Sequence, residues 1–145
     1  MGSAAFLLAL VIAGTGPLLD RFRRTVPPNV TLLGYVSRET LIERLARARS
    51  LILPGVEDFG ITPLEAMALG TPVVALAEGG VLDSVAPGTT GIFFAHPTVD
   101  ALRKALDEVE GREWDRDALR RHASAFSRAR FQRQFIDALT RVTSA

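Results

Sequence analysis

The chain has 145 residues, of which 48% are apolar, so it is long enough to fold as one domain, residues 1–145, around a buried core. Lys and Arg exceed Asp and Glu by a single charge, which argues against nucleic acid as a partner. The sequence contains no cysteine, which excludes disulfides, thiolate metal sites and cysteine nucleophiles.

The first predicted element lies in the apolar stretch that opens the chain. This stretch is shorter than the roughly 20 residues that a membrane-spanning helix needs, and no positively charged leader precedes it. We interpret residues 8–13 as a buried strand that ends in a tight turn at Gly14, Thr15 and Gly16, in preference to a cleaved signal peptide. The interpretation of residues 1–7 as non-native sequence stays open.

Short apolar runs then alternate with longer amphipathic stretches, a pattern typical of βα units around a parallel sheet. The predicted strands are residues 8–13, 30–33, 51–53, 73–76 and 92–94. The predicted helices are residues 18–24, 38–49, 63–69, 81–85 and 98–109, with Ser37 and Thr62 as N-caps. The sequence therefore predicts an α/β fold with a Rossmann-like parallel sheet of about five strands.

Residues 112–145 form a predicted helical extension, because no further strand follows Gly111. Its helices cover residues 115–125 and 127–142, and Trp114 is expected to anchor their start. The second helix has one apolar stripe that needs a surface to pack against, formed by Phe131, Phe135, Ile136 and Leu139. The many arginines of the extension are interpreted as a solvated helix face, in preference to a patch for anionic membranes or nucleic acid.

In an open parallel sheet, ligands bind beyond the carboxyl ends of the strands. The loop after the third predicted strand is the most informative, because Gly60 and Ile61 precede a helix and present free N–H groups at its positive end. Phosphate or diphosphate is the usual occupant of such a site. Gly79 and Gly80 follow the fourth strand and offer a second backbone concavity beside it.

Two glutamates flank this predicted anion site, and each can be interpreted as structural or as ligand-binding. Glu65 completes a capping box with Thr62, which local sequence favours over a role in ligand binding. Glu57 is either a solvated loop carboxylate next to Asp58 or a group that faces sugar hydroxyls, since two acids would otherwise repel the anion. His96 and His122 stand alone, so no metal site is expected.

The run EDFGITPLEAMA from Glu57, followed by GTPVVA and by Gly79-Gly80, resembles the donor-site signature of family 4 retaining glycosyltransferases. The similarity extends from about Val11 to the C-terminus, and the segment from Phe126 to Phe131 resembles bacterial mannosyltransferases of that family. The resemblance implies the C-terminal, donor-binding half of a GT-B fold. It also implies transfer of a mannose- or glucose-type hexose in cell-surface polysaccharide biosynthesis.

The resemblance assigns roles to individual positions. Glu57 would be the catalytic residue that contacts the transferred sugar, and Glu65 would bind the ribose hydroxyls. The other donor-binding residues that it implies are Gly14, Thr15, Gly16, Tyr35, Val36, Phe59, Gly60, Ile61, Thr62, Leu64, Gly79 and Gly80. It implies no cofactor and no metal, with GDP-mannose as the preferred donor.

The family has an N-terminal acceptor-binding domain and a basic diphosphate clamp that this sequence lacks, so we expect the isolated chain to be inactive. We expect a cytoplasmic protein at the inner face of the membrane, with peripheral membrane contact. A non-catalytic nucleotide-binding or assembly module is the alternative function. A sugar-nucleotide epimerase or a phosphorylase is disfavoured, since no suitable catalytic histidine or cofactor lysine is present.

The usual strand order of this fold has one more, central strand between the strands that correspond to residues 8–13 and 51–53. Buried backbone groups must be paired, so an unfilled slot is not expected there. We predict either that these two strands pair directly in a closed five-stranded sheet, or that the chain associates with itself through this seam.

Overall fold

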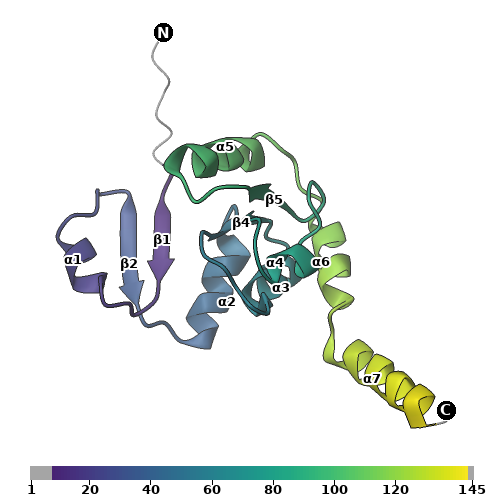
Figure 1. Cartoon of the computed structure of the whole chain (residues 1–145). Helices are drawn as coiled ribbons and strands as arrows, with labels where there is room; N and C mark the ends of the chain where they lie inside the picture. The colour runs from purple at the N-terminus through teal and green to yellow at the C-terminus, as the bar shows by residue number, and fades with distance from the viewer. Residues whose placement is uncertain (1–7, 144–145) are drawn as a thin grey trace. The chain divides into compact units, whose positions relative to one another are not determined.

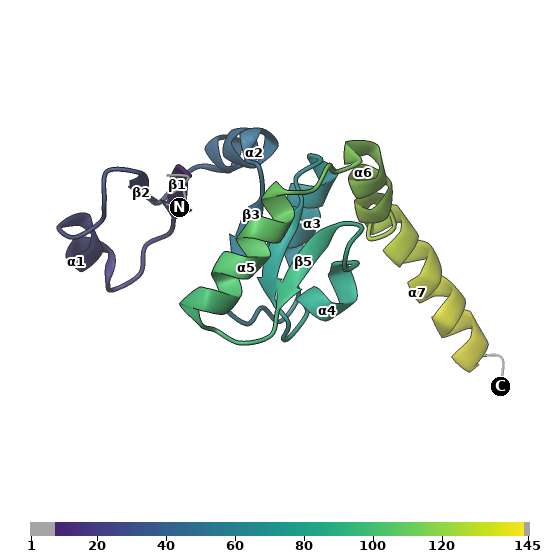
Figure 2. The same ribbon diagram turned by 90° about the horizontal axis from the view of Figure 1, so that it is seen from above.

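The computed structural model describes residues 8–143, so the interpretation of residues 1–7 lies outside the described residues. The chain divides into two compact units, residues 1–41 and 42–145. Figure 1 labels the helices and most of the strands, and Figure 2, the view at right angles, labels β3.

The first unit contains two parallel strands joined by a short helix. Strand β1 (Leu10–Ala13) pairs with β2 (Val30–Gly34), and α1 (Leu19–Arg23) connects them. The prediction of a first strand is thus confirmed, but its predicted burial is wrong: Leu10, Val11 and Ile12 are 36%, 42% and 44% exposed. The reason is that β1 pairs on one side only, and α1 buries none of its own residues against the strands.

The second unit has a three-stranded parallel sheet in the order β3 (Leu51–Leu53), β4 (Val73–Leu76) and β5 (Gly91–Phe94). All five predicted strands therefore exist, but they form two parallel sheets. The direct pairing of the first and third strands is not found among the described residues, where β1 pairs with β2 and β3 pairs with β4. The three-residue β3 offers only a short ladder to any further strand. Self-association through the seam remains a prediction.

Helices cover the three-stranded sheet of the second unit. Helix α5 (Val99–Glu110) packs on β4 and β5, while α3 (Ile61–Ala68) packs on β4 and against α6 (Arg116–Ser124). In Figure 2, α5 and α6 lie on opposite sides of β5. The core between α5 and the sheet consists of Val74, Leu76, Ile92, Phe94, Ala105 and Val109.

Trp114 borders this core and confirms its predicted role. Its side chain packs against the α5 cluster, and its indole Nε1 donates to the carbonyl oxygen of Val109 at 3.1 Å. The indole therefore fixes the point where the helical extension leaves α5.

Two of the predicted helix caps can be compared with the structure. Ser37 caps α2 (Arg38–Arg47), since its Oγ accepts from the Thr40 amide at 3.3 Å. The prediction of Thr62 as an N-cap is wrong, because α3 begins at Ile61 and its N-cap is Gly60. Gly60 adopts left-handed backbone angles, φ 65° and ψ 39°, and these turn the chain into the helix earlier than the sequence pattern suggested.

The last helix, α7 (Arg128–Thr143), is exposed along its whole length. The predicted apolar stripe is present, and Phe131 and Phe135 stack with ring centroids 5.7 Å apart. These two side chains are 64% and 52% exposed, so the stripe is not covered by the described part of the chain.

Asp115 caps α6, and its removal should lower stability. Its carboxylate accepts from the amides of Asp117 at 2.9 Å and Ala118 at 3.0 Å, and the amide of Ala118 is the main cause that holds the pKa of Asp115 below its ordinary value of 3.8. We expect Asp115→Ala to lower the Tm by a few degrees at neutral pH, measured by circular dichroism, because the two amides lose their acceptor.

The same measurement has a pH signature. A carboxylate whose pKa is lowered in the folded state stabilises the protein above its unfolded pKa, and this contribution is lost as pH falls through the folded pKa. The difference in Tm between parent and Asp115→Ala should therefore be constant above pH 3.8 and shrink below it. Glu113→Ala, at an exposed neighbouring acid, is the matched control and should have little effect; equal effects of the two variants would contradict the capping role.

Candidate functional site

The loops that follow β3 and β4 lie side by side at the carboxyl edge of the sheet. The amide of Gly80 donates to the carbonyl oxygen of Glu57 at 2.6 Å, and Glu57 forms a parallel bridge with Gly79. A Cβ at Gly79 would lie 2.6 Å from the Glu57 oxygen, and one at Gly80 would lie 2.4 Å from the Asp58 oxygen. On the side where a Cβ would stand, the neighbouring loop therefore fills the space beside each glycine. The predicted role of Gly79 and Gly80 in ligand binding stays a prediction.

The N-terminus of α3 opens at the end of the first of these loops. Gly60 is the N-cap, and no side chain of the cap residue accepts from the first turn. An α-helix leaves its first N–H groups without intrahelical partners, and the helix dipole makes this end positive. The left-handed Gly60 thus starts a helix of the kind that binds anions.

The predicted site residues of this loop differ in exposure. Glu57, Phe59 and Ile61 are exposed, with Phe59 at 84% and Ile61 at 62%. Thr62, Leu64 and Glu65, on the first turns of α3, are half-buried. The main chain of Glu57 is held by its hydrogen bond from the Gly80 amide, while the residue as a whole is exposed.

The remaining predicted site residues belong to the first unit. Its two loops meet at the carboxyl ends of β1 and β2, where the amide of Gly14 donates to the carbonyl oxygen of Gly34 at 2.8 Å. Gly16 accepts from the Leu19 amide at 3.0 Å and starts the turn into α1. The segment 14–16 therefore lies beside the loop of Tyr35 and Val36, and the Tyr35 side chain is 82% exposed.

Ser84 is a residue of this region that the sequence analysis did not select. It lies in α4 (Val81–Ser84), is 2% exposed, and its Oγ has no hydrogen-bond partner within the described residues. Leaving a buried hydroxyl unpaired costs about 1–3 kcal/mol. Nothing in the sequence could have revealed it, because serine is usually exposed and its burial here depends on packing between loops distant in sequence.

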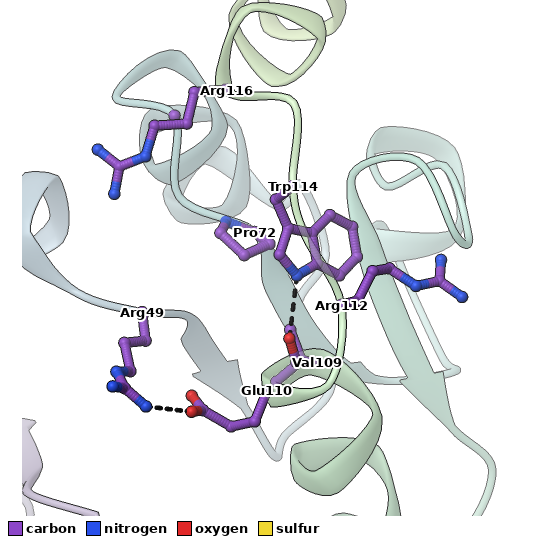
Figure 3. Close-up of a pocket in the computed structure, with 8 residues that line it drawn as sticks. Arg49, Pro72, Val109, Glu110, Arg112, Trp114 and Arg116 are labelled. Carbon is purple, nitrogen blue, oxygen red and sulfur yellow. Dashed lines mark hydrogen bonds and ion pairs between the residues drawn. The ribbon is translucent and has the colours of Figure 1, made fainter.

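A hollow of about 320 Å³ lies at the opposite, amino edge of the sheet and is shown in Figure 3. Three arginines line it, and two of them, Arg49 and Arg112, make contacts within the protein. Arg49 forms an ion pair with Glu110, and Arg112 donates to the Gly88 carbonyl oxygen at 2.7 Å while its guanidinium lies over the Trp114 ring. Both arginines follow the C-termini of helices, where positive charge is favourable. None of the predicted site residues lines this hollow.

Within residues 8–143, no group of three His, Asp or Glu side chains is arranged to hold a metal ion. No helix within this range combines the length and the apolar character needed to cross a bilayer.

The parallel strands, the flanking helices and the glycine-started helix at their carboxyl edge are those of a Rossmann-like α/β fold. Residues 8–126 match the family model described as glycosyl transferases group 1. The chain belongs to this family, and its fold is that of one half of a GT-B glycosyltransferase.

Similar proteins agree with this assignment. An uncharacterized glycosyltransferase of Methanocaldococcus jannaschii is 36% identical over 106 residues, which cover 69% of this chain and 27% of that protein. The GDP-mannose-dependent alpha-(1-6)-phosphatidylinositol monomannoside mannosyltransferase of Mycobacterium tuberculosis is 33% identical over 131 residues, covering 73% of this chain and 34% of that protein.

Among solved structures, the apo form of the lipopolysaccharide outer core galactosyltransferase WaaB has a TM-score of 0.78 at 22% identity, and the alignment covers 90% of this chain and 40% of that structure. The chain thus spans about a third or less of the length of these two relatives and two fifths of the solved structure. The predicted family and fold class are confirmed.

Proposed function

We propose that this chain is the donor-binding half of a retaining glycosyltransferase, which holds a nucleoside diphosphate sugar while a hexose passes to an acceptor. The observation that carries the proposal is the helix start at Gly60, where the first turn of α3 is left without a side-chain cap. It lies at the carboxyl edge of the sheet, beside two loops joined main chain to main chain. An anion with several oxygens matches this arrangement of donors.

In this proposal the diphosphate lies at the α3 N-terminus. Developing negative charge on the leaving diphosphate would be stabilised by fixed N–H groups and by the helix dipole, without a metal. Glu57 would contact the hydroxyls of the transferred sugar, and Glu65 would bind the ribose. Gly14, Thr15 and Gly16, with Tyr35 and Val36, would flank the nucleobase.

The finer identity of the donor is also a proposal. GDP-mannose is supported by the similarity to the mycobacterial enzyme, whose name states its dependence on GDP-mannose. An acceptor-binding half would be supplied outside this sequence, since the relatives are about three times as long. The reaction would then occur at the cytoplasmic face of the membrane, and the isolated chain would not turn over.

A non-catalytic nucleotide-binding or assembly module remains the second candidate. An assay of mannose transfer and GDP-mannose hydrolysis separates the two. Turnover that appears when an acceptor-binding domain of a relative is added supports the glycosyltransferase, whereas binding without turnover in both conditions supports the module.

The donor site itself is tested by GDP titration of Glu65→Ala in a calorimeter. We expect binding roughly tenfold weaker than for the parent, because a carboxylate that accepts from ribose hydroxyls contributes about 1.5 kcal/mol. Glu108→Ala, at an exposed acid of α5, is the matched control and should bind as the parent does. Equal GDP affinity of the parent and Glu65→Ala would count against the assigned role of Glu65.

A further inference from the structure

Ser84 is the last residue of α4, the helix that follows the loop of Gly80. The amide of Gly80 in that loop donates to the carbonyl oxygen of Glu57. The main-chain carbonyl oxygen of Ser84 already has a partner, since it lies 2.9 Å from Nε2 of His122. The side-chain Oγ is buried and has no partner within the described residues. Buried hydroxyl groups in native proteins are nearly always hydrogen-bonded, so this one requires an explanation.

The position of the Ser84 hydroxyl relative to Gly60 suggests why it lacks a partner. The Ser84 Oγ lies 3.0 Å from the point where a Cβ on Gly60 would stand, so it faces the N-cap of α3 directly. The carbonyl oxygen of Gly80 is the next nearest atom, at 3.4 Å from the same point. The unpaired donor therefore lies next to the residue at which α3 starts, where the diphosphate is proposed to bind.

We propose that the Ser84 hydroxyl is a further donor of this anion site and donates to a phosphoryl oxygen of the bound nucleoside diphosphate, directly or through one ordered water. This inference rests on the proposed function, because it requires the diphosphate at the N-terminus of α3. The bound ligand would give the hydroxyl the acceptor that residues 8–143 do not provide.

A purely steric role for Ser84 makes a different prediction. The close approach to Gly60 requires a small side chain at this position, and alanine satisfies that requirement as well as serine does. Alanine removes the hydroxyl and adds no atoms. The variant Ser84→Ala therefore separates size from hydrogen bonding.

The experiment compares GDP and guanosine binding to the parent, Ser84→Ala and Ser84→Gly by isothermal titration, with thermal unfolding of each protein measured without ligand. For Ser84→Ala we expect GDP binding roughly tenfold weaker, guanosine binding unchanged and a Tm no lower than that of the parent. We expect Ser84→Gly to weaken GDP binding by the same factor. Ser124→Ala, at an exposed serine of α6, is the control for serine removal.

The possible outcomes test the role of Ser84 and the proposed donor site separately. Equal GDP affinity of the parent and Ser84→Ala overturns the role of Ser84 and leaves the donor site intact. Weakening of GDP and guanosine by the same factor also overturns it, because the hydroxyl would then act on the whole site and not on phosphate. A parent chain that binds neither GDP nor another nucleoside diphosphate overturns the proposed function, and this inference with it.

Discussion

Replacing Gly80 with alanine is expected to abolish GDP binding and to lower the free energy of unfolding by about 3 kcal/mol. The added Cβ would stand 2.4 Å from the carbonyl oxygen and 2.8 Å from the carbonyl carbon of Asp58, and both atoms belong to main chain. A flexible side chain could move aside, but here the whole loop before Gly60 must shift. Calorimetric titration with GDP and urea unfolding measure the two effects.

Gly55→Ala is the matched control for this prediction. Gly55 lies in the same segment between β3 and α3, yet a Cβ there would meet no atom within 4 Å. The variant should bind GDP as the parent does and change stability by less than about 0.5 kcal/mol. Similar effects at Gly55 and Gly80 would show that loop flexibility, and not the close approach to Asp58, controls the site.

Leu119→Ala is expected to lower the free energy of unfolding by about 3 kcal/mol. Leu119 is fully buried on α6, the helix that packs against α3. The truncation would leave a cavity behind the helix that carries the anion site, and its cost depends on how far α6 can close it. Urea unfolding measures the change.

Leu139→Ala on α7 provides the comparison, because this leucine is 50% exposed. Its loss should change stability by less than about 0.5 kcal/mol. A large effect at Leu139, or a small one at Leu119, would contradict the arrangement of the two C-terminal helices.

The parallel strands of the second unit were predictable because their apolar runs are short and bounded by turn residues. The bounds of β3 and β4 agree with prediction residue for residue, and the buried β4 explains why the run after Pro72 is wholly apolar. The place of the loop before α3 was predictable for a related reason, since the loops that follow parallel strands lie at the carboxyl edge of their sheet.

The features that the sequence analysis missed have two physical causes, which are local backbone geometry and contacts between distant segments. Thr62 reads as a cap from local sequence, but the left-handed Gly60 starts the helix earlier. The burial of residues 8–13 depends on what covers β1, and the hydroxyl of Ser84 matters only because two loops bring it to Gly60. The hydrophobic periodicity of the sequence contains no information on either cause.

The hydrogen bond between Gly80 and Glu57 has a consequence for local motion. The Gly80 amide is shielded from exchange with solvent deuterium only while the Glu57 carbonyl stays in place, so neither loop can open alone. The two loops should exchange as one cooperative segment, and occupancy of the α3 N-terminus should slow deuterium uptake in the loop before α4 as much as in the loop before α3.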